Sequence, residues 1–422
     1  MESATAVLGD IFVMFLVAKV AGELFERIHQ PPVIGELLAG VAIGPYALGW
    51  VGMPAPAMVD LFHGDAAEAL ESIYAVLAEL GAIVLLFLVG LETRLSDILR
   101  VGVRAGLVAV LGVIAPFVLG AAFVLSLGDP PIEALFLGTA MVATSVGITA
   151  RVLADLGQIQ EREARIILGA AVIDDILGMM VLAVMSSLGT GGGLSLAELG
   201  LITGQAVGFT VFVALAGRHA AQRWSIHLER LRIQNAPFVV AVLVMLGMAV
   251  LAAKISLAAI IGAFLAGMVF AELREQYELE KQVLPLYEFL VPLFFVITGT
   301  HVDWRLFLDG SVLGIALAVT ALAIVGKLLG CGLGAWGLGA RSVAIIGVGM
   351  VPRGEVGLIV ANVGKSLGVI PEVLFSTVVV MSVLTTLVVP PVLMVLYRGR
   401  GEAVRSQAAI DDAVADGRLP EL

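Results

Sequence analysis

Long apolar stretches separated by short polar segments run along the chain, and this pattern predicts helices that cross a membrane. About 20 consecutive apolar residues in a helix span the hydrocarbon core of a bilayer. Thirteen stretches approach or exceed that length, and we therefore expect an all-α polytopic membrane protein. The expected spans cover residues 4–27, 32–50, 72–93, 98–127, 131–154, 162–188, 196–217, 235–253, 257–272, 283–301, 311–337, 341–367 and 371–397.

The composition excludes the main alternatives to a helical membrane protein. Of the 422 residues, 60% are hydrophobic and 14% are charged, and the mean hydropathy is +1.05. Soluble domains have about 45–50% apolar and about 25% charged residues. The single cysteine, Cys331, excludes an intrachain disulfide. A transmembrane barrel is excluded because its strands would alternate between apolar and polar residues.

Lysine and arginine are distributed unevenly between the two faces that thirteen spans would create. One face carries 18 of these residues and the other carries three, Lys254, Arg305 and Lys365. Positively charged loops remain on the cytoplasmic side. We therefore expect an external N-terminus and a cytoplasmic C-terminus. The compact chain without a targeting sequence fits a bacterial inner membrane. Residues 1–3 lack the basic region of a signal peptide, so the first span is expected to be retained.

Five ionisable residues lie near the middle of predicted spans: Asp174, Asp175, Lys327, Arg353 and Glu355. Each such residue costs about 2.5–3.5 kcal/mol at a helix centre on insertion scales, so the five are expected to face one another or water. Three are acidic and two are basic. The one carboxylate in excess indicates a site for a cation or a proton.

The neighbouring aspartates point about 100° apart on a helix, so one can pair with a lysine while the other faces a cavity. Two adjacent carboxylates titrate as a pair and can exchange protons for a hard cation. Asp174 and Lys327 could instead form a fixed pair that only holds helices together. Arg353 and Glu355 are expected to form a fixed internal pair, with a direct role in transport as the alternative.

Two spans carry residues that interrupt a helix at their centres, at 143–147 and at 349–357. Proline removes a backbone donor, and glycine loosens the helix. Backbone groups freed at this depth are tolerated only where they are buried or face a cavity. The two interruptions lie seven spans apart, so their helices cross the membrane in opposite directions. This parity is typical of an inverted repeat with its binding site at the midplane.

Three of these segments together resemble the monovalent cation:proton antiporters. They are Val172-Ile173-Asp174-Asp175-Ile176, Ala143-Thr144-Ser145-Val146-Gly147 and Pro352-Arg353-Gly354-Glu355-Val356-Gly357. The resemblance extends over about residues 5–398 and is nearest to the electrogenic two-aspartate branch that includes the NapA-type sodium/proton antiporters. It implies about thirteen transmembrane helices in an NhaA-like inverted repeat with two crossing discontinuous helices.

The resemblance also implies residue roles. Asp175 would bind the cation, and Asp174 would pair with Lys327 and couple the cation to protons. Thr144 and Ser145 would line the ion path, and Arg353 and Glu355 would be the charges of the second crossing helix. The transported ions would be H⁺ and Na⁺, Li⁺ or K⁺. No catalytic residue, bound cofactor or nucleic-acid partner is expected.

The family's two-part organisation implies a homodimer in which a core moves like an elevator against a dimerisation domain. Residues 1–95 and 235–302 would form the dimerisation domain, and 96–190 and 303–398 the two halves of the core. Residues 191–234 would be a linker helix with a cytoplasmic connector, and 399–422 a short polar tail.

Alternative functions remain open at this stage. Relatives that export potassium usually carry glutamine where this chain has Asp174, which favours sodium or lithium without excluding a K⁺/H⁺ antiporter. A sodium-coupled symporter of organic anions would keep the fold and change the cargo. A channel is less favoured, because a single excess carboxylate suits a one-ion site. Adjacent aspartates on one helix cannot both face a scissile bond, which disfavours an intramembrane protease.

Overall fold

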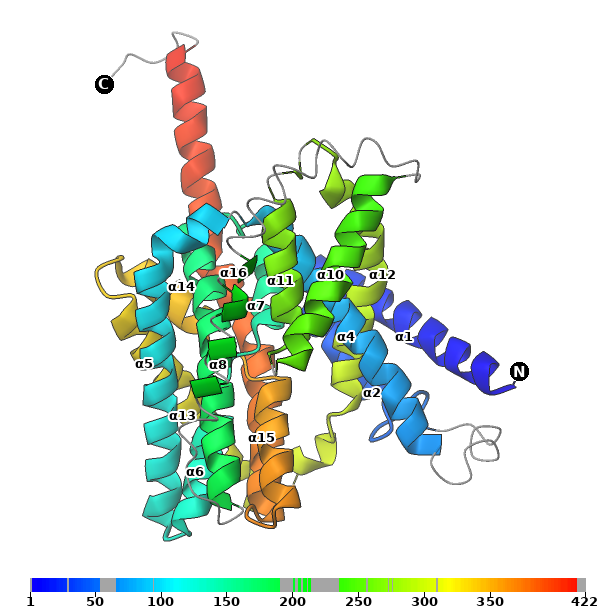
Figure 1. The fold of residues 1–422 in the computed structure, drawn as a ribbon, viewed down its shortest axis with the longest axis vertical. Helices are drawn as coiled ribbons and strands as arrows, with labels where there is room; N and C mark the ends of the chain where they lie inside the picture. Colours follow the sequence, from blue (N-terminus) through cyan, green and yellow to red (C-terminus); the bar gives the residue numbers. More distant parts are fainter. Residues whose placement is uncertain are drawn as a thin grey trace.

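The computed structural model describes most of the chain as packed helices (Figure 1). The described residues are 2–28, 30–53, 66–93, 95–189, 200–201, 204–205, 208–210, 212–213, 235–255, 257–271, 273–274, 276–308 and 310–415. Every regular element within them is a helix, so the expected all-α class is confirmed.

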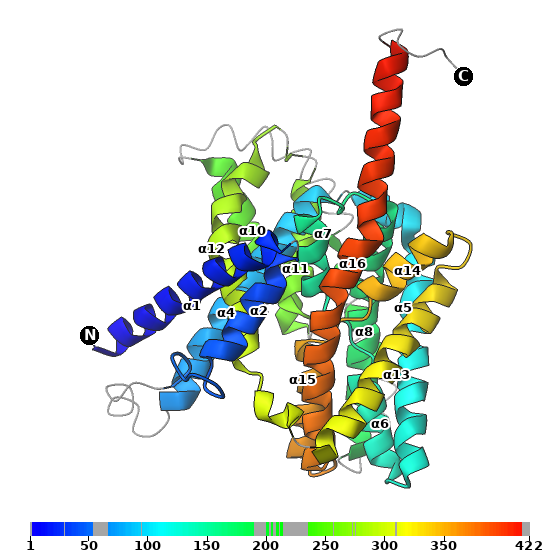
Figure 2. The same ribbon diagram turned by 180° about the vertical axis from the view of Figure 1, so that it is seen from behind.

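Six helices from two separate parts of the chain form one group, which we call the α4 group. Within it, α4 packs against α11 and α12, and α2 packs against α1 and α12. Figures 1 and 2 show these helices together on one side of the molecule. The members are α1 (Glu2–Arg27), α2 (Pro32–Ile43), α4 (Ala66–Glu92), α10 (Ala236–Lys254), α11 (Ala259–Phe270) and α12 (Leu279–Thr300).

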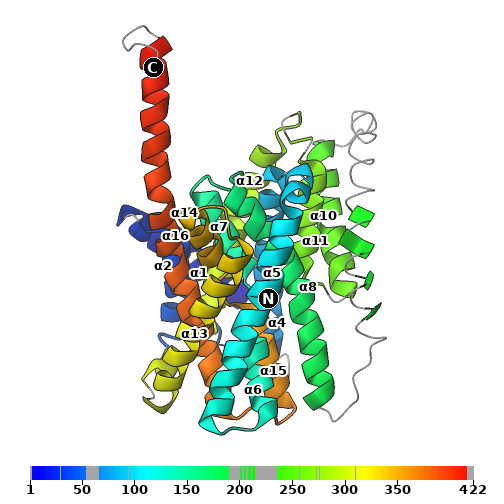
Figure 3. The same cartoon turned by 90° about the vertical axis from the view of Figure 1, so that its left-hand side faces the viewer.

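Eight helices form a second group, the α8 group. Here α5 packs against α6, α8 and α13, and α16 packs against α13 and α15. Figure 3, which views the molecule from this side, shows α5 and α13 running beside each other. The members are α5 (Leu95–Leu127), α6 (Pro131–Ala140), α7 (Val146–Asp155), α8 (Arg162–Gly189), α13 (Gly310–Gly334), α14 (Ala340–Gly349), α15 (Glu355–Ser366) and α16 (Glu372–Ala415).

The two groups meet mainly where α7 contacts α2 and α4, and where α16 contacts α2. The short 3-10 helix η1 (Trp304–Phe307) lies between the end of α12 and the start of α13. The chain therefore passes from the α4 group to the α8 group twice, once after Glu92 and once after Thr300.

Seven of the described helices are long and apolar enough to cross a membrane, as judged by length and composition. They lie within α1, α4, α5, α10, α12, α13 and α16, where long spans are expected. Shorter apolar helices are α2, α6, α11, α14 and most of α15. The expected span 196–217 and the linker 191–234 lie largely outside the described residues.

One expected boundary needs correction. The short span expected at 32–50 is wrong in length, because α2 ends at Ile43 and turns follow. Pro45 has no backbone N–H and disfavours helical geometry at Gly44, which is extended. At the other end of the chain, the apolar part of α16 ends at Tyr397, in agreement with the expected span 371–397, and the helix continues as far as Ala415.

Close approach of glycine pairs brings neighbouring helices of the α4 group together. A Cβ added at Gly40 of α2 would lie against the carbonyl oxygen of Val296 and 2.9 Å from the Cα of Gly299. A Cβ added at Gly299 would in turn lie 2.9 Å from the Cα of Gly40. Small residues allow helix backbones in membranes to approach in this way.

We expect Gly40→Ala to destabilise the protein by about 1–3 kcal/mol, the usual effect of inserting a methyl group into a filled interface. The obstructing atoms belong to backbone, so they cannot move aside without shifting α12. Thermal melting of the purified protein measures the effect. Gly9→Ala is the control, because nothing lies within 4 Å of a Cβ at Gly9. Equal melting temperatures for the two variants would contradict the prediction.

Candidate ion-binding site

Both spans with interrupting residues are broken in the structure. Helix α6 ends at Ala140 and α7 begins at Val146, while α14 ends at Gly349 and α15 begins at Glu355. Within the second break, Pro352 supplies no backbone N–H, and Gly349 and Gly354 lie at the two ends of the break. The two short non-helical segments, 141–145 and 350–354, lie against each other.

Hydrogen bonds between the breaks satisfy backbone groups that the helices leave open. The backbone N–H of Ser145 donates to the carbonyl oxygen of Pro352 at 2.8 Å. The hydroxyl of Thr144 donates to the carbonyl of Met350 at 3.2 Å. Thr149, one turn into α7, donates to the carbonyl of Gly349 at 2.7 Å. Residues about 200 positions apart in the sequence therefore form one unit.

Arg353 is fully buried at this crossing. Its Nη1 atom donates to the carbonyl oxygens of Ala143 and Met350, at 3.1 and 3.3 Å. Thr385 and Thr386 of α16 bind its backbone: Arg353 N–H donates to Thr385 Oγ1, and Thr386 Oγ1 donates to the Arg353 carbonyl. A positive charge thus lies against carbonyl oxygens of both breaks, where it offsets their partial negative charge.

Asp174 of α8 and Lys327 of α13 form an ion pair with 3.0 Å between Oδ1 and Nζ. Both side chains are fully buried. The pairing that the resemblance implied is therefore present in the structure, while its role in coupling stays a prediction. Arg353 also interacts electrostatically with Asp174.

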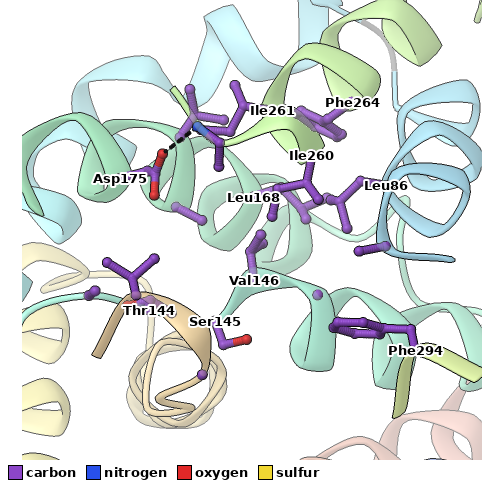
Figure 4. Close-up of a pocket in the computed structure, with 18 residues that line it drawn as sticks. Leu86, Thr144, Ser145, Val146, Leu168, Asp175, Ile260, Ile261, Phe264 and Phe294 are labelled. Atoms are coloured by element: carbon purple, nitrogen blue, oxygen red, sulfur yellow. Dashed lines mark hydrogen bonds between the residues drawn. The ribbon is translucent and has the colours of Figure 1, made fainter. Parts of the chain in front are cut away.

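Asp175, the next residue on α8, is half-buried and lines a pocket (Figure 4). The backbone N–H of Ala258, just before α11, donates to its Oδ2 atom at 3.5 Å. Figure 4 shows Asp175 on one side of the pocket, with Thr144 and Ser145 nearby on the first break. The adjacent aspartates thus have different surroundings, as their helical spacing predicts.

The pocket lies between the two helix groups. The α8 group contributes the first break, part of α8 and the start of α15, while α4, α11 and α12 contribute apolar side chains. The lining residues are Ala82, Leu86, Ala143, Thr144, Ser145, Val146, Gly147, Leu168, Ala171, Val172, Asp175, Ala258, Ile260, Ile261, Phe264, Phe294, Gly354 and Val356.

The pocket has the groups that a small cation needs. Among the described lining residues, Asp175 is the one ionisable side chain, and Thr144 and Ser145 add hydroxyl groups. Broken helices at the membrane midplane bind cations through such carboxylates, hydroxyls and exposed carbonyls. The apolar walls from α11 and α12 strengthen the electrostatic attraction, because they exclude water.

Sequence reasoning identified the polar side of this site and missed the apolar side. Asp175, Thr144 and Ser145 line the pocket, while Asp174, Lys327 and Arg353 lie buried behind it. Glu355 is the first residue of α15, and its side chain lies outside the described part. The backbone of Ala258 and the rings of Phe264 and Phe294 carried no signal, since apolar residues are common throughout the chain.

A methyl group at Gly354 is expected to disturb the site. Its Cβ would lie 2.6 Å from Ser145 Oγ and 2.9 Å from Ser145 Cβ, so the breaks would have to separate. We expect Gly354→Ala to slow transport by about 10- to 100-fold, the effect of misplacing reacting groups by about 1 Å. Ion flux in proteoliposomes measures this. Gly314→Ala, with nothing within 4 Å of its Cβ, should match the wild type. A wild-type rate for Gly354→Ala would show that the breaks tolerate separation.

The chain is similar in sequence to known transport proteins over nearly its whole length. The family profile described as "Sodium/hydrogen exchanger, transmembrane" matches residues 12–396. The chain is 38% identical over 417 residues to the high-affinity Na⁺/H⁺ antiporter NhaS3 of Synechocystis sp.. That alignment covers 93% of this chain and 90% of the relative. This chain is also 36% identical over 404 residues to the Na⁺/H⁺-K⁺ antiporter GerN of Bacillus cereus. That alignment covers 94% of this chain and 98% of GerN.

A solved structure has a similar fold. The structure of the sodium proton antiporter MjNhaP1 from Methanocaldococcus jannaschii matches with a TM-score of 0.62. The match covers 94% of this chain and 98% of that one, at 16% sequence identity. At this identity the likeness concerns the course of the helices alone.

Proposed function

Because this chain belongs to the sodium/hydrogen exchanger family, we propose that it is a secondary active Na⁺/H⁺ antiporter that also accepts Li⁺. Membership makes it an integral, multi-pass membrane transporter and not an enzyme. The names of the relatives NhaS3 and GerN support sodium as the cation.

The pocket carboxylate of Asp175 carries this proposal. It is the one ionisable group among the described lining residues, and it lies next to hydroxyls of a broken helix. The neighbouring carboxylate of Asp174 is already engaged by Lys327 and is fully buried. A pocket whose described lining contains one carboxylate suits one monovalent cation or one proton at a time.

In the proposed mechanism, Na⁺ and protons compete for Asp175. Cation binding allows the Asp174–Lys327 pair to change its charge state and release a second proton. Two protons exchanged for one sodium ion move one net charge per cycle. At about 2.3 kcal/mol per charge per 100 mV, the membrane potential would then drive sodium export. Such a mechanism would place the chain in the electrogenic two-aspartate branch.

The proposed architecture has thirteen membrane crossings, with the broken helices α6–α7 and α14–α15 as corresponding parts of an inverted repeat. The α8 group would be the moving core, and the α4 group the dimerisation domain of a homodimer. Their position on either side of the Asp175 pocket supports alternating access by an elevator-like motion. The N-terminus would be external and the C-terminus cytoplasmic, in a bacterial inner membrane.

Potassium is the second candidate cation, since the relative GerN is named a Na⁺/H⁺-K⁺ antiporter. An organic-anion symporter is not favoured. Arg353 donates to the carbonyls of Ala143 and Met350, and the described pocket lining includes no basic side chain that would hold a carboxylate.

Proteoliposomes loaded with a pH-sensitive dye test the proposal. Addition of Na⁺ or Li⁺ to vesicles that carry an imposed pH gradient should move protons, and an imposed membrane potential should change the rate. A larger response to K⁺ would favour potassium. An absence of proton movement with all three cations would refute antiport. Flux that is fast and independent of the pH gradient would indicate a channel.

A further inference from the structure

A buried group of charges lies at the contact between the two helix groups, away from the ion pocket. Arg151 of α7 lies 3.5 Å from Glu36 of α2, measured from Nη2 to Oε1. Its Nε atom also donates to Asp155, one turn along α7, at 3.0 Å. Its guanidinium lies over the ring of Tyr287 of α12, with 5.0 Å from Cζ to the ring centroid. We call these four residues the Arg151 cluster.

The cluster joins helices of different groups. Glu36 and Tyr287 belong to the α4 group, whereas Arg151 and Asp155 belong to the α8 group. Arg151 lies near the end of the expected span 131–154, where arginine side chains commonly reach the membrane surface, but its own side chain is only 9% exposed. Glu36 is 3% exposed. These two residues therefore form a buried contact across the boundary.

The same helix connects this contact to the ion site. Ser145, at the start of α7, lines the pocket, and Arg151 follows six residues later, about 9 Å along the axis. Thr149 ties this helix to Gly349 of the second break. A displacement of α7 relative to α2 would therefore move Ser145 in the pocket and, at the same time, separate Arg151 from Glu36.

The chemistry of the contact suits an interface that opens. Burying an ion pair generally adds little stability compared with apolar side chains of similar size. Within the described residues, Glu36 Oε2 and Arg151 Nη1 have no hydrogen-bond partner. The hydrogen bonding of the pair is thus incomplete here, and water would satisfy these atoms once the groups separate. An apolar contact would instead oppose opening, because its residues would be exposed to water.

We propose that Arg151 is a positioning residue of the transport cycle. Paired with Glu36, it holds the two helix groups together on its side of the pocket, and this contact breaks when the α8 group moves. The inference rests on the proposed alternating access. In that cycle, the Arg151–Glu36 contact would set the relative populations of the two access states.

Thiol labelling of the pocket tests this inference. Ile260, which lines the pocket from α11, is replaced by cysteine in a Cys331→Ala background. A charged, membrane-impermeant thiol reagent is then added from one side of the vesicle or from the other. Glu36→Gln should raise the labelling rate from the side of Arg151 by about tenfold, as a minor access state becomes a major one. Labelling from the opposite side should fall.

A matched control removes a carboxylate of similar type from an exposed ion pair. Glu23 and Arg27 lie 2.8 Å apart on α1, with Glu23 58% exposed. Glu23→Gln should label as the parent does. Labelling needs no ion gradient, so a shift in access without cation-dependent proton movement would retain the Arg151 contact and refute the proposed cation transport. Normal transport with unchanged labelling would refute the role of the Arg151 contact and retain the proposed cation transport.

A second variant keeps the experiment decisive if Glu36→Gln alone misfolds. If Glu36→Gln leaves a harmful unpaired Arg151, the double variant Glu36→Gln/Arg151→Gln removes both buried charges and should show the same shift in labelling. Labelling within twofold of the parent from both sides, in every variant that is purified in monodisperse form, would overturn the inference. As a further readout, a reducible bifunctional thiol reagent that joins Glu36→Cys to Arg151→Cys in the Cys331→Ala background should stop transport until the link is reduced.

Discussion

Replacement of Asp175 by asparagine is expected to abolish cation-dependent proton movement. The amide has nearly the same shape, but it neither binds a proton in this pH range nor supplies the negative charge that attracts the cation. Asp175 is the one ionisable residue of the pocket, so no neighbour in the described lining replaces it. Dye-loaded proteoliposomes should respond to Na⁺, Li⁺ and K⁺ no more than vesicles without protein.

This loss should occur without a loss of folding. Asp175 is half-buried, and the backbone N–H of Ala258 that donates to it can donate to the amide oxygen of asparagine. The melting temperature of Asp175→Asn should therefore remain near that of the wild type. Asp175→Glu keeps the charge and is the matched control, with measurable but slower exchange expected. Exchange that survives in Asp175→Asn would show that another group binds the cation.

The second large effect is expected for Lys327→Gln, which leaves Asp174 without its ion-pair partner. Both side chains are fully buried, and removal of one partner of a buried pair typically costs about 3–5 kcal/mol. We expect a lower melting temperature, together with exchange that is sharply slower or electroneutral. Transport at several imposed membrane potentials measures the charge moved per cycle.

The double variant Asp174→Asn/Lys327→Gln separates stability from coupling. It removes both buried charges, with asparagine matching aspartate in shape and glutamine shorter than lysine, so it should regain part of the lost stability. Its exchange should still lack voltage dependence, because the second proton has no binding group. A voltage dependence that is unchanged in Lys327→Gln would contradict the coupling role and leave the pair as a structural contact.

The sequence analysis located those features of the site that are costly in a membrane. Charges at mid-span and helix-interrupting residues stand out against an apolar background, and Asp174, Asp175 and Lys327 were recognised for this reason. Features that depend on tertiary packing left no such mark. The Ala258 N–H is a backbone group, and Phe294 is one apolar residue among many.

The fold shows the same division. Apolar stretches predicted the positions of the long helices, because the required length follows from bilayer thickness. The early end of α2 at Ile43 was missed, since the residues after it are also apolar. Arg151 lies near the end of the expected span 131–154, where arginine is common, so its position along the chain carried no sign of burial. Its burial depends on Glu36 and Tyr287, which approach it only in the packed protein.

The hydrogen bonds between the two broken helices also have a consequence for biosynthesis. Thr144 and Met350 are 206 residues apart, so a ribosome working at about 5–20 residues per second needs roughly 10–40 s to supply the partner. During that interval the first break is already synthesised, but the carbonyls and amides of the second are missing. Backbone groups without partners are poorly tolerated in lipid. Until α14 and the second break are synthesised, these groups of the first break must be satisfied by water or by another protein.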